Sequence, residues 1–286
     1  MIKTNFADMH LHTTASDGTL SPSELVALAY ESGISTIALT DHDTVGGIAE
    51  AKAALPSGMT LIPGVEFSCF FDTGEPFLLH ILGYGIDPDA SSINDVIRLG
   101  KRTRAHKHTK RLEYLKERYC ISFTDEELEF FNTRPNVGKP HIAEVLRRRG
   151  MAWSIKEAID TFMSSPDFPD GNIPASSAIR SIVESGGIPV YAHSLGGECD
   201  ARLSYEQTQR RILLMKEAGI LGLECYYSRY SREDEAFLLS VAKRLGLLVS
   251  GGSDFHGKNK TVVIGELSNE GQKIGCDKLS VLDKIR

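Results

Sequence analysis

The chain has 286 residues, 41% hydrophobic and 24% charged, as in a soluble globular protein with a large core. Its formal net charge of −6 gives no electrostatic reason to expect duplex nucleic acid as a partner. No apolar run approaches the ~20 residues that cross a bilayer, and the start lacks an apolar signal core. With an odd number of cysteines, five, and no close pair among them, we expect reduced thiols and a cytoplasmic protein without a membrane partner.

The first hundred residues alternate between strand and helix patterns. A strand is expected to end at His10-Leu11-His12, and Ser21-Pro22-Ser23-Glu24 then predicts a helix start with a capping box. Residues 34–40, 60–68 and 77–84 read as further strands, with a helix over residues 46–54. This alternation is typical of an α/β protein.

The pattern changes in the middle of the chain. Helices are predicted over residues 91–118, 124–131, 139–149 and 154–162, and no convincing strand is expected between roughly 100 and 175. The turn-rich stretch 164–171 reads as an exit linker. We therefore interpret residues 100–175 as an all-helical insertion.

Alternation resumes after the insertion. Helices are expected over residues 176–185, 205–218 and 231–245, and strands over 188–193, 221–227 and 247–251. Repeated βα units imply parallel strands with helices outside, and the polar motifs fall at the carboxyl ends of the strands. The predicted fold is a barrel-like (β/α)7 arrangement built from residues 1–99 and 176–286.

Polar residues at these strand ends have the chemistry of metal ligands. His10 and His12 are two apart in a strand, so both imidazoles can reach one ion. Asp254 and His256 repeat this spacing in a glycine-rich turn that is expected to leave room for ions and substrate. Asp17 has an equally plausible role as a turn carboxylate.

Three further residues interrupt apolar strands. Glu66 is costly in an apolar strand unless it is paired or bound to metal, and bridging two ions would satisfy it. His80 and His193 each lie within or at the end of an apolar run, where a lone histidine is more often a hydrogen-bonded core residue. His42 stands between Asp41 and Asp43, and the ordinary role for Asp43 is to cap the next helix.

The joint order of these motifs resembles the PHP (polymerase and histidinol phosphatase) family. The resemblance rests on His-x-His, Asp-Gly, Thr-Asp-His-Asp, Gly-Val-Glu, two later histidines and Gly-Ser-Asp-x-His, and it covers residues 8–84 and 187–257. It implies a distorted (β/α)7 barrel and a metal-dependent phosphoesterase with two or three divalent ions (Mn²⁺, Fe²⁺, Zn²⁺ or Mg²⁺). The implied ligand sets are His10, His12, Glu66 and Asp254 for the first ion, Glu66, His80 and His193 for the second, and Asp17, His42 and His256 for the third.

Many relatives carry histidine at the Asp17 position. The carboxylate of this chain is a harder ligand, so its third site is expected to prefer Mn²⁺, Fe²⁺ or Mg²⁺ over Zn²⁺.

The insertion narrows the resemblance to small bacterial phosphoesterases of this family that act on nucleotides. Such proteins remove the 3′-phosphate of nucleoside 3′,5′-bisphosphates or trim short RNA from the 5′ end, and the insertion is implied to cover the metal pocket. We expect a nucleotide or short oligonucleotide as the substrate and no obligate protein partner. The candidates for phosphate contact are Arg134, Lys139, His141 and Arg229.

The catalytic roles follow from the same resemblance. Glu66 is expected to bridge two ions that activate a water for attack on phosphorus, and His193 or His256 to protonate the leaving group. His141 has an alternative role as a metal ligand. Most of the basic residues in the stretch 98–111 are expected to form a solvated helix face, and His106 and His108 do not share a face there.

Other functions stay open from the sequence. Within enzymes, these are a phosphatase for another small phosphomonoester, such as histidinol phosphate, and an amidohydrolase-type metal barrel. A non-catalytic, metal-stabilised binding module is a third reading, which the full apparent ligand set disfavours.

Overall fold

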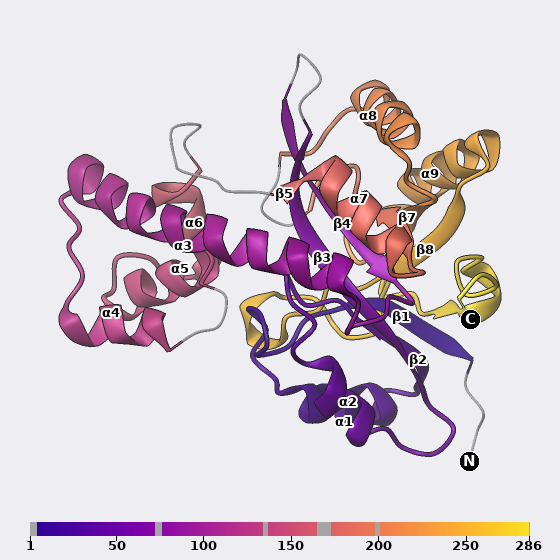
Figure 1. Ribbon diagram of the computed structural model, residues 1–286, viewed down its shortest axis with the longest axis horizontal. Coiled ribbons are helices and arrows are strands. Elements are labelled where there is room, and N and C mark those ends of the chain that lie inside the picture. Colours follow the sequence, from indigo (N-terminus) through magenta and orange to yellow (C-terminus); the bar gives the residue numbers. More distant parts are fainter. Residues whose placement is uncertain (1–4, 72–75, 134–136, 165–172, 198–200, 286) are drawn as a thin grey trace.

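The computed structural model describes residues 5–71, 76–133, 137–164, 173–197 and 201–285, and it is a mixed α/β structure built on a nearly closed sheet (Figure 1). In the described residues, the sheet order is β8-β7-β6-β4-β3-β2-β1-β9, with β5 paired to β3. The strands are β1 (Phe6–Leu11), β2 (Ile34–Leu39), β3 (Thr60–Phe71), β4 (Phe77–Tyr84), β5 (Ile173–Pro174), β6 (Ile188–Tyr191), β7 (Gly222–Tyr227), β8 (Leu248–Gly252) and β9 (Ile274–Gly275).

The sheet curls until its two ends meet. Beyond the end of β8, the Asp254 N–H donates to the His10 carbonyl oxygen at 2.9 Å, and the His12 N–H donates to the Phe255 carbonyl oxygen at 3.0 Å. The short strand β9 pairs with the other end of β1. The barrel predicted from the sequence is therefore confirmed, and its closure brings the residues after β8 against the end of β1.

Strand β4 corrects the expectation that the barrel strands are all parallel. β4 pairs antiparallel with both β3 and β6, whereas the other neighbouring strands among β1, β2, β3, β6, β7 and β8 pair in parallel. Only residues 72–76 separate β3 from β4, which allows a hairpin but not the crossover that parallel strands require. A second correction is β5, a two-residue strand in a stretch where the sequence predicted none.

Helices pack on the outside of the barrel at two places. Figure 1 shows α1 and α2 together on one side of the sheet and α7, α8 and α9 on another. These helices are α1 (Pro22–Glu31), α2 (Ile48–Ala53), α7 (Ala175–Glu184), α8 (Tyr205–Ala218) and α9 (Arg232–Leu245). The capping box predicted for α1 is confirmed, because the Ser21 side chain accepts from the Glu24 N–H and the Glu24 carboxylate accepts from the Ser21 N–H.

The helices between β4 and β5 extend away from the barrel as a lobe (Figure 1). They are α3 (Ser91–Tyr119), α4 (Asp125–Asn132), α5 (Lys139–Arg148) and α6 (Ile155–Phe162). The start of α3 packs Ile93, Val96 and Ile97 into the outer core of the barrel, whereas Leu115 near its end belongs to a separate apolar cluster within the lobe. The division into a barrel and an insertion at residues 100 and 175 stays a prediction.

An apolar layer lies inside the barrel beneath the polar residues. Ile62 on β3 and Leu82 on β4 belong to one buried cluster with Met9 and Val190. Ile62 is four residues from Glu66 and Leu82 is two residues from His80, so each pair shares a strand face. The interior of the barrel is thus apolar at the level of Ile62 and Leu82 and polar at the level of Glu66 and His80.

None of the helices in the described part of the chain combines the length and hydropathy that a bilayer-spanning segment requires. Cys69, Cys120, Cys225 and Cys276 are free thiols, and Cys199 lies outside the described residues.

Glu235 gives a pH-dependent prediction for the stability of this fold. It lies in α9, is only 8% exposed, and its Oε1 accepts no hydrogen bond from any described residue. Burial raises its pKa from 4.5 to about 7, opposed by Arg232 and assisted by Glu270. The folded state therefore binds the carboxyl proton of Glu235 more tightly than the unfolded state does. The contribution of this proton to the free energy of unfolding is complete below pH 4.5 and is lost as the pH rises through 7.

Glu235→Gln is therefore expected to raise the free energy of unfolding at pH 8 by about 1 kcal/mol, allowing for screening, and to change little at pH 4.5. Urea unfolding at both pH values measures this effect. Glu206→Gln, at an exposed site in the first turn of α8, is the matched control. A Glu235→Gln protein with the same pH trend as the unaltered chain would contradict the argument.

Candidate metal centre

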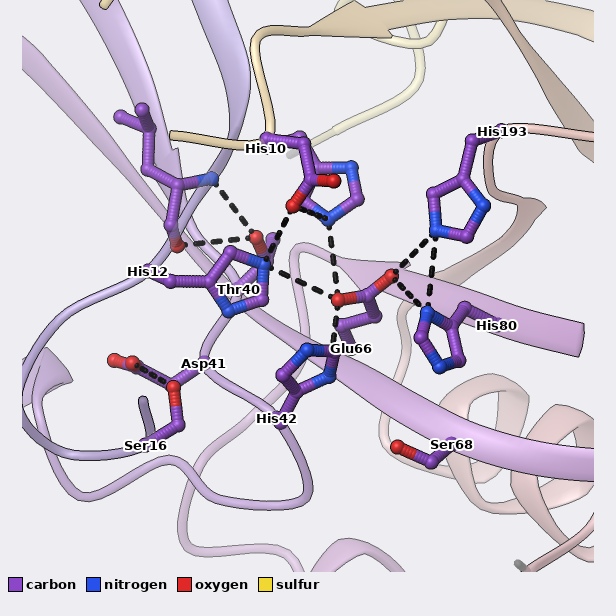
Figure 2. A network of polar contacts seen from close by, with 12 residues as sticks. His10, His12, Ser16, Thr40, Asp41, His42, Glu66, Ser68, His80 and His193 are labelled. Atoms are coloured by element: carbon purple, nitrogen blue, oxygen red, sulfur yellow. Dashed lines mark hydrogen bonds and ion pairs between the residues drawn. The ribbon is translucent and has the colours of Figure 1, made fainter. Parts of the chain in front are cut away.

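Glu66, on β3, lies at the centre of a group of histidines that come from β1 and β4 and from the ends of β1, β2 and β6 (Figure 2). Its Oε2 is 3.2 Å from His10 Nε2, 3.1 Å from His12 Nε2 and 3.1 Å from His42 Nδ1. Its Oε1 faces the other way, 3.0 Å from His80 Nδ1 and 3.2 Å from His193 Nε2. The two oxygens of one fully buried carboxylate thus serve two separate sets of imidazoles.

The remaining predicted ligands complete the same cluster. Asp254 Oδ1 lies 3.6 Å from His10 Nε2 and 3.4 Å from His12 Nε2. Asp17 Oδ1 lies 3.2 Å from His256 Nε2, and Asp17 Oδ2 lies 4.0 Å from His42 Nε2. Asp17 therefore faces the cluster rather than serving only its own turn.

Within the described residues, three groups of ligand atoms lie close enough to hold an ion, each within 4.8 Å of one another. The first contains the four residues predicted for the first ion, and the third contains the three predicted for the third ion together with His12. The second joins His42 to Glu66 and His80, where the sequence suggested His193; His193 Nε2 lies 3.2 Å from His80 Nδ1. The groups are His10, His12, Glu66 and Asp254; His42, Glu66 and His80; and His12, Asp17, His42 and His256.

Buried atoms at the centre fit a metal ion. His10 Nε2, His12 Nε2 and Glu66 Oε2 are all buried, and none has a hydrogen bond within the described part of the chain. A buried polar atom without a partner is costly, and a divalent cation satisfies imidazole nitrogen and carboxylate oxygen together. The donor set of nitrogens and carboxylates also matches the first-row divalent ions.

The charges in the metal-free cluster favour the metal-binding forms of Glu66, His12 and His42, but not of His10. Burial lowers the pKa of His10, but Glu66, Glu224 and Asp254 outweigh burial and raise that pKa well above its ordinary value, so an ion that binds there has to displace a proton. Burial raises the pKa of Glu66, but the nearby His10, His80 and His42 outweigh it and hold that pKa well below its ordinary value. Burial lowers the pKa of His12 well below its ordinary value and that of His42 to about 3. A neutral imidazole and an ionised carboxylate are the protonation states of metal ligands.

Two further buried carboxylates hold the backbone around the cluster. Asp41 accepts hydrogen bonds from the Thr13 N–H at 2.7 Å, the Thr13 hydroxyl at 2.7 Å and the Ser16 hydroxyl at 2.6 Å, which fixes the loop that carries Asp17 (Figure 2 shows Asp41 and Ser16). Asp43 does not cap α2, whose N-cap is Gly47; it accepts from the Ser68 N–H at 2.9 Å. Because Asp43 binds the strand that bears Glu66, its role here is to position that strand.

Some residues hydrogen-bond to the proposed ligands and orient them, and these residues were not predicted from the sequence. Tyr227 donates its hydroxyl to Asp254 Oδ2 at 2.9 Å, and Lys260 Nζ lies 2.5 Å from the same oxygen. Together they leave Asp254 Oδ1 facing His10 and His12. Glu224, on β7, accepts from His10 Nδ1 at 2.9 Å. An acid in the middle of an otherwise apolar strand was the available signal for Glu224, the same signal that identified Glu66.

Gly252 has a different role from the one expected of the glycine-rich turn. A Cβ there would lie 2.2 Å from His10 Cβ and 2.5 Å from the His10 backbone nitrogen, so the room is filled by β1 rather than by ions. The absent side chain lets β8 and β1 approach closely enough to close the barrel at His10.

Gly252→Ala is expected to destabilise the protein by about 3 kcal/mol and to weaken metal binding, because the backbone that carries His10 must move. Urea unfolding and a Mn²⁺ titration measure the two effects. Gly46→Ala is the control, since a Cβ there would meet only the Thr44 hydroxyl, at 3.3 Å. Unchanged stability of the Gly252→Ala protein would show that β1 and β8 are not held this tightly.

The predicted phosphate contacts are more scattered. Arg134 lies outside the described residues. Lys139 and His141 begin α5 in the lobe, and His141 Nδ1 accepts the Gly138 N–H at 3.1 Å; none of the three ligand groups in the described chain includes His141. Arg229 lines a surface cavity of about 390 Å³ with Ser228, Thr261 and Asn269.

Comparison with known proteins gives matches along most of the chain. The family described as PHP domain matches residues 8–152. A 3′,5′-nucleoside bisphosphate phosphatase of Chromobacterium violaceum is 30% identical over 256 residues, which are 87% of this chain and 86% of the relative. A 5′-3′ exoribonuclease Rnm of Escherichia coli is 31% identical over 270 residues, covering 90% and 88% of the two chains.

A solved structure has the same fold over almost the whole chain. It belongs to a protein of Bifidobacterium adolescentis described as a candidate metal-dependent phosphoesterase. The two chains are 29% identical, the TM-score is 0.80, and the match covers 98% of this chain and 94% of the other.

Proposed function

The chain belongs to the PHP domain family and is a metal-dependent phosphoesterase, and from this premise we propose that it hydrolyses phosphate esters of nucleotides. The proposed principal reaction removes the 3′-phosphate of a nucleoside 3′,5′-bisphosphate, which converts adenosine 3′,5′-bisphosphate to AMP. The observation that carries the proposal is the position of Glu66, whose two oxygens face different sets of histidines. One carboxylate placed in this way suits a bridge between two cations.

The proposed ligands for two or three divalent ions are the residues of the cluster. His10, His12, Glu66 and Asp254 would hold one ion, Glu66 with His80 and His193 the second, and Asp17, His42 and His256 the third; His42, which lies near both of the last two groups, would bind only one ion, because a neutral imidazole has one lone pair. Bound ions would supply Lewis-acid stabilisation of the phosphoryl oxygens and a water of lowered pKa. The nitrogen and carboxylate donors of these residues suit Mn²⁺, Fe²⁺, Zn²⁺ or Mg²⁺.

The protein side chains would supply the proton for the leaving group. His256 has both nitrogens engaged, because Nδ1 lies 2.9 Å from the Asp254 carbonyl oxygen and Nε2 lies 3.2 Å from Asp17. His193 is 7% exposed and stands next to His80, which at 30% side-chain exposure is the most open histidine around Glu66. A ring nitrogen that binds an ion has no proton to donate, so His193 or His256 would act as the general acid only as an alternative to binding an ion.

Substrate contacts from the lobe form the remaining part of the proposal. Arg134, Lys139 and His141 would bind a second phosphate group, with the lobe over the metal centre, and Arg229 would do so from the barrel rim. The relative of Chromobacterium violaceum is named for a substrate with two phosphates, and the second phosphate of such a substrate is the group that these residues would contact.

A panel of phosphate esters tests the proposed substrate. With Mn²⁺ present, adenosine 3′,5′-bisphosphate is expected to give kcat/KM at least about tenfold above that of histidinol phosphate, because lobe contacts to a second phosphate add binding energy. Release of inorganic phosphate and the appearance of AMP are the measurements. Preference for histidinol phosphate or another non-nucleotide ester would overturn the proposal.

Short RNA is the second candidate substrate, and the Escherichia coli relative favours it because it is named a 5′-3′ exoribonuclease. A 5′-phosphorylated oligoribonucleotide of a few residues would be shortened from its 5′ end, and gel analysis of a 3′-labelled substrate measures this. If the labelled RNA stays intact while the bisphosphate is hydrolysed, the activity is restricted to mononucleotides.

A further inference from the structure

Glu224 is a carboxylate behind the metal centre that contacts two different strand ends at once. It lies on β7 and is completely buried. Its Oε1 is 2.9 Å from His10 Nδ1, and its Oε2 accepts the backbone N–H of His193 at 2.7 Å. One side chain therefore reaches both a ring of β1 and the backbone that follows β6.

The contact with His10 fixes which ring nitrogen faces the cluster. A carboxylate accepts, so Nδ1 carries the proton and donates it to Glu224. In the neutral ring, Nε2 is then the nitrogen with a lone pair, and it points at Glu66 and Asp254, 3.2 Å and 3.6 Å away. A second carboxylate that fixes the tautomer and orientation of a histidine is a common support for a metal ligand.

The contact with His193 supports an unusual backbone conformation. His193 has a φ of +24°, in the region that residues other than glycine rarely adopt. Glu224 accepts the N–H of this residue, and the His193 carbonyl oxygen accepts the Gly196 N–H at 2.8 Å. The turn held in this way directs the His193 ring toward Glu66 Oε1.

We propose that Glu224 is a positioning residue that joins the two halves of the metal centre. His10 faces Oε2 of Glu66 and His193 faces Oε1, so a single carboxylate sets the ligands on both sides of the proposed bridge. The inference rests on the metal centre of the proposed function but not on its substrate. Loss of Glu224 is therefore expected to weaken binding on both sides together.

Two substitutions separate position from charge. Glu224→Gln keeps the size of the side chain, but its amide offers a single oxygen for the two donors. Glu224→Asp keeps the charge but is one methylene too short to reach His10 and His193 simultaneously. Both variants are expected to bind Mn²⁺ about 10- to 100-fold more weakly than the unaltered protein.

The measurement is calorimetric titration of the metal-free, full-length proteins with Mn²⁺, after circular dichroism has established that each variant is folded. Glu235→Gln, another buried carboxylate but one outside the cluster, is the matched control and is expected to bind Mn²⁺ as the unaltered protein does. Unaltered affinity of the Glu224→Asp protein would overturn the positioning role, since charge alone would then suffice. Since no substrate is present, a wrong substrate assignment leaves this result intact.

A measurement on the unaltered chain keeps the inference testable if the variants do not fold. Nitrogen-15 NMR of histidine-labelled protein loaded with Zn²⁺ reports which ring nitrogen of each histidine is protonated. His10 is expected to carry its proton on Nδ1 and to bind the ion through Nε2. A His10 protonated on Nε2, or one that binds through Nδ1, would contradict the inference.

Discussion

Glu66→Gln is expected to lower kcat for the preferred phosphate ester by about 10³-fold, which corresponds to about 4 kcal/mol of transition-state stabilisation. The amide has one oxygen and one NH₂ group, so it cannot offer an anionic oxygen both to the His10, His12 and His42 side and to the His80 and His193 side. The same change removes the negative charge that offsets two cations. Phosphate release at saturating Mn²⁺ measures the activity, and elemental analysis of the dialysed protein measures bound metal, which is expected to fall as well.

Glu235→Gln is the control, because it makes the same chemical change at a buried carboxylate of α9 outside the cluster. It is expected to retain the activity and metal content of the unaltered chain. Full metal-dependent turnover by the Glu66→Gln protein would show that Glu66 does not bridge, and the proposed centre would then need a different arrangement of ions.

Asp8→Ala is expected to lower the free energy of unfolding by about 4 kcal/mol, without any change in the residues proposed to bind metal. Asp8 is fully buried and accepts hydrogen bonds from the His10 N–H at 3.3 Å, the Ser253 N–H at 2.9 Å, the Ser253 hydroxyl at 2.6 Å and the Gly265 N–H at 2.8 Å. Removing the carboxylate leaves buried backbone donors unsatisfied where β1 meets the residues after β8. Urea unfolding of the metal-free protein measures the loss.

Asp8→Asn is a smaller change in the same hydrogen-bond network, because it keeps the size of the side chain and one acceptor oxygen. Its NH₂ group would face the Ser253 hydroxyl or the Gly265 N–H instead of accepting from it, so an intermediate loss is expected. Asp89→Ala, at an exposed acid, is the control and is expected to change stability by less than about 0.5 kcal/mol. An Asp8→Ala protein as stable as the control would show that water or neighbouring groups satisfy those donors.

The sequence could predict the helices and strands because their signals are local. The limits of β4 and α8 agree with the expected ranges 77–84 and 205–218, and the capping box of α1 forms as its sequence indicates. The antiparallel direction of β4 was not predicted, because the βα alternation around it suggested parallel strands. The deciding feature is the connection from β3, which is too short for the crossover that a parallel pair requires. The two-residue strand β5 is too short to have a periodicity of its own.

The site was predictable as a set of residues but not as an arrangement. His10, Glu66 and Asp254 have a residue type and a place in an apolar or glycine-rich stretch that a structural role explains poorly. His42 joins the group of Glu66 and His80 as well as that of Asp17, which no spacing in the sequence reveals. Glu224 and Lys260 were not identified from the sequence, because their roles depend on contacts that only the fold creates. Glu224 contacts His10, more than two hundred positions away, and Lys260 contacts Asp254 across a turn.

By itself, the sequence determined the kinds of donor atom and the strands that carry them, because residue type and alternation along a strand are local properties of the chain. Only the tertiary structure decided that the barrel closes at His10, that Glu66 turns one oxygen to each side, and that Glu224 ties β1 to the end of β6. These features depend on how strands distant in the sequence approach one another. That approach is set by the closure of the sheet and by glycines such as Gly252, where a side chain has no room.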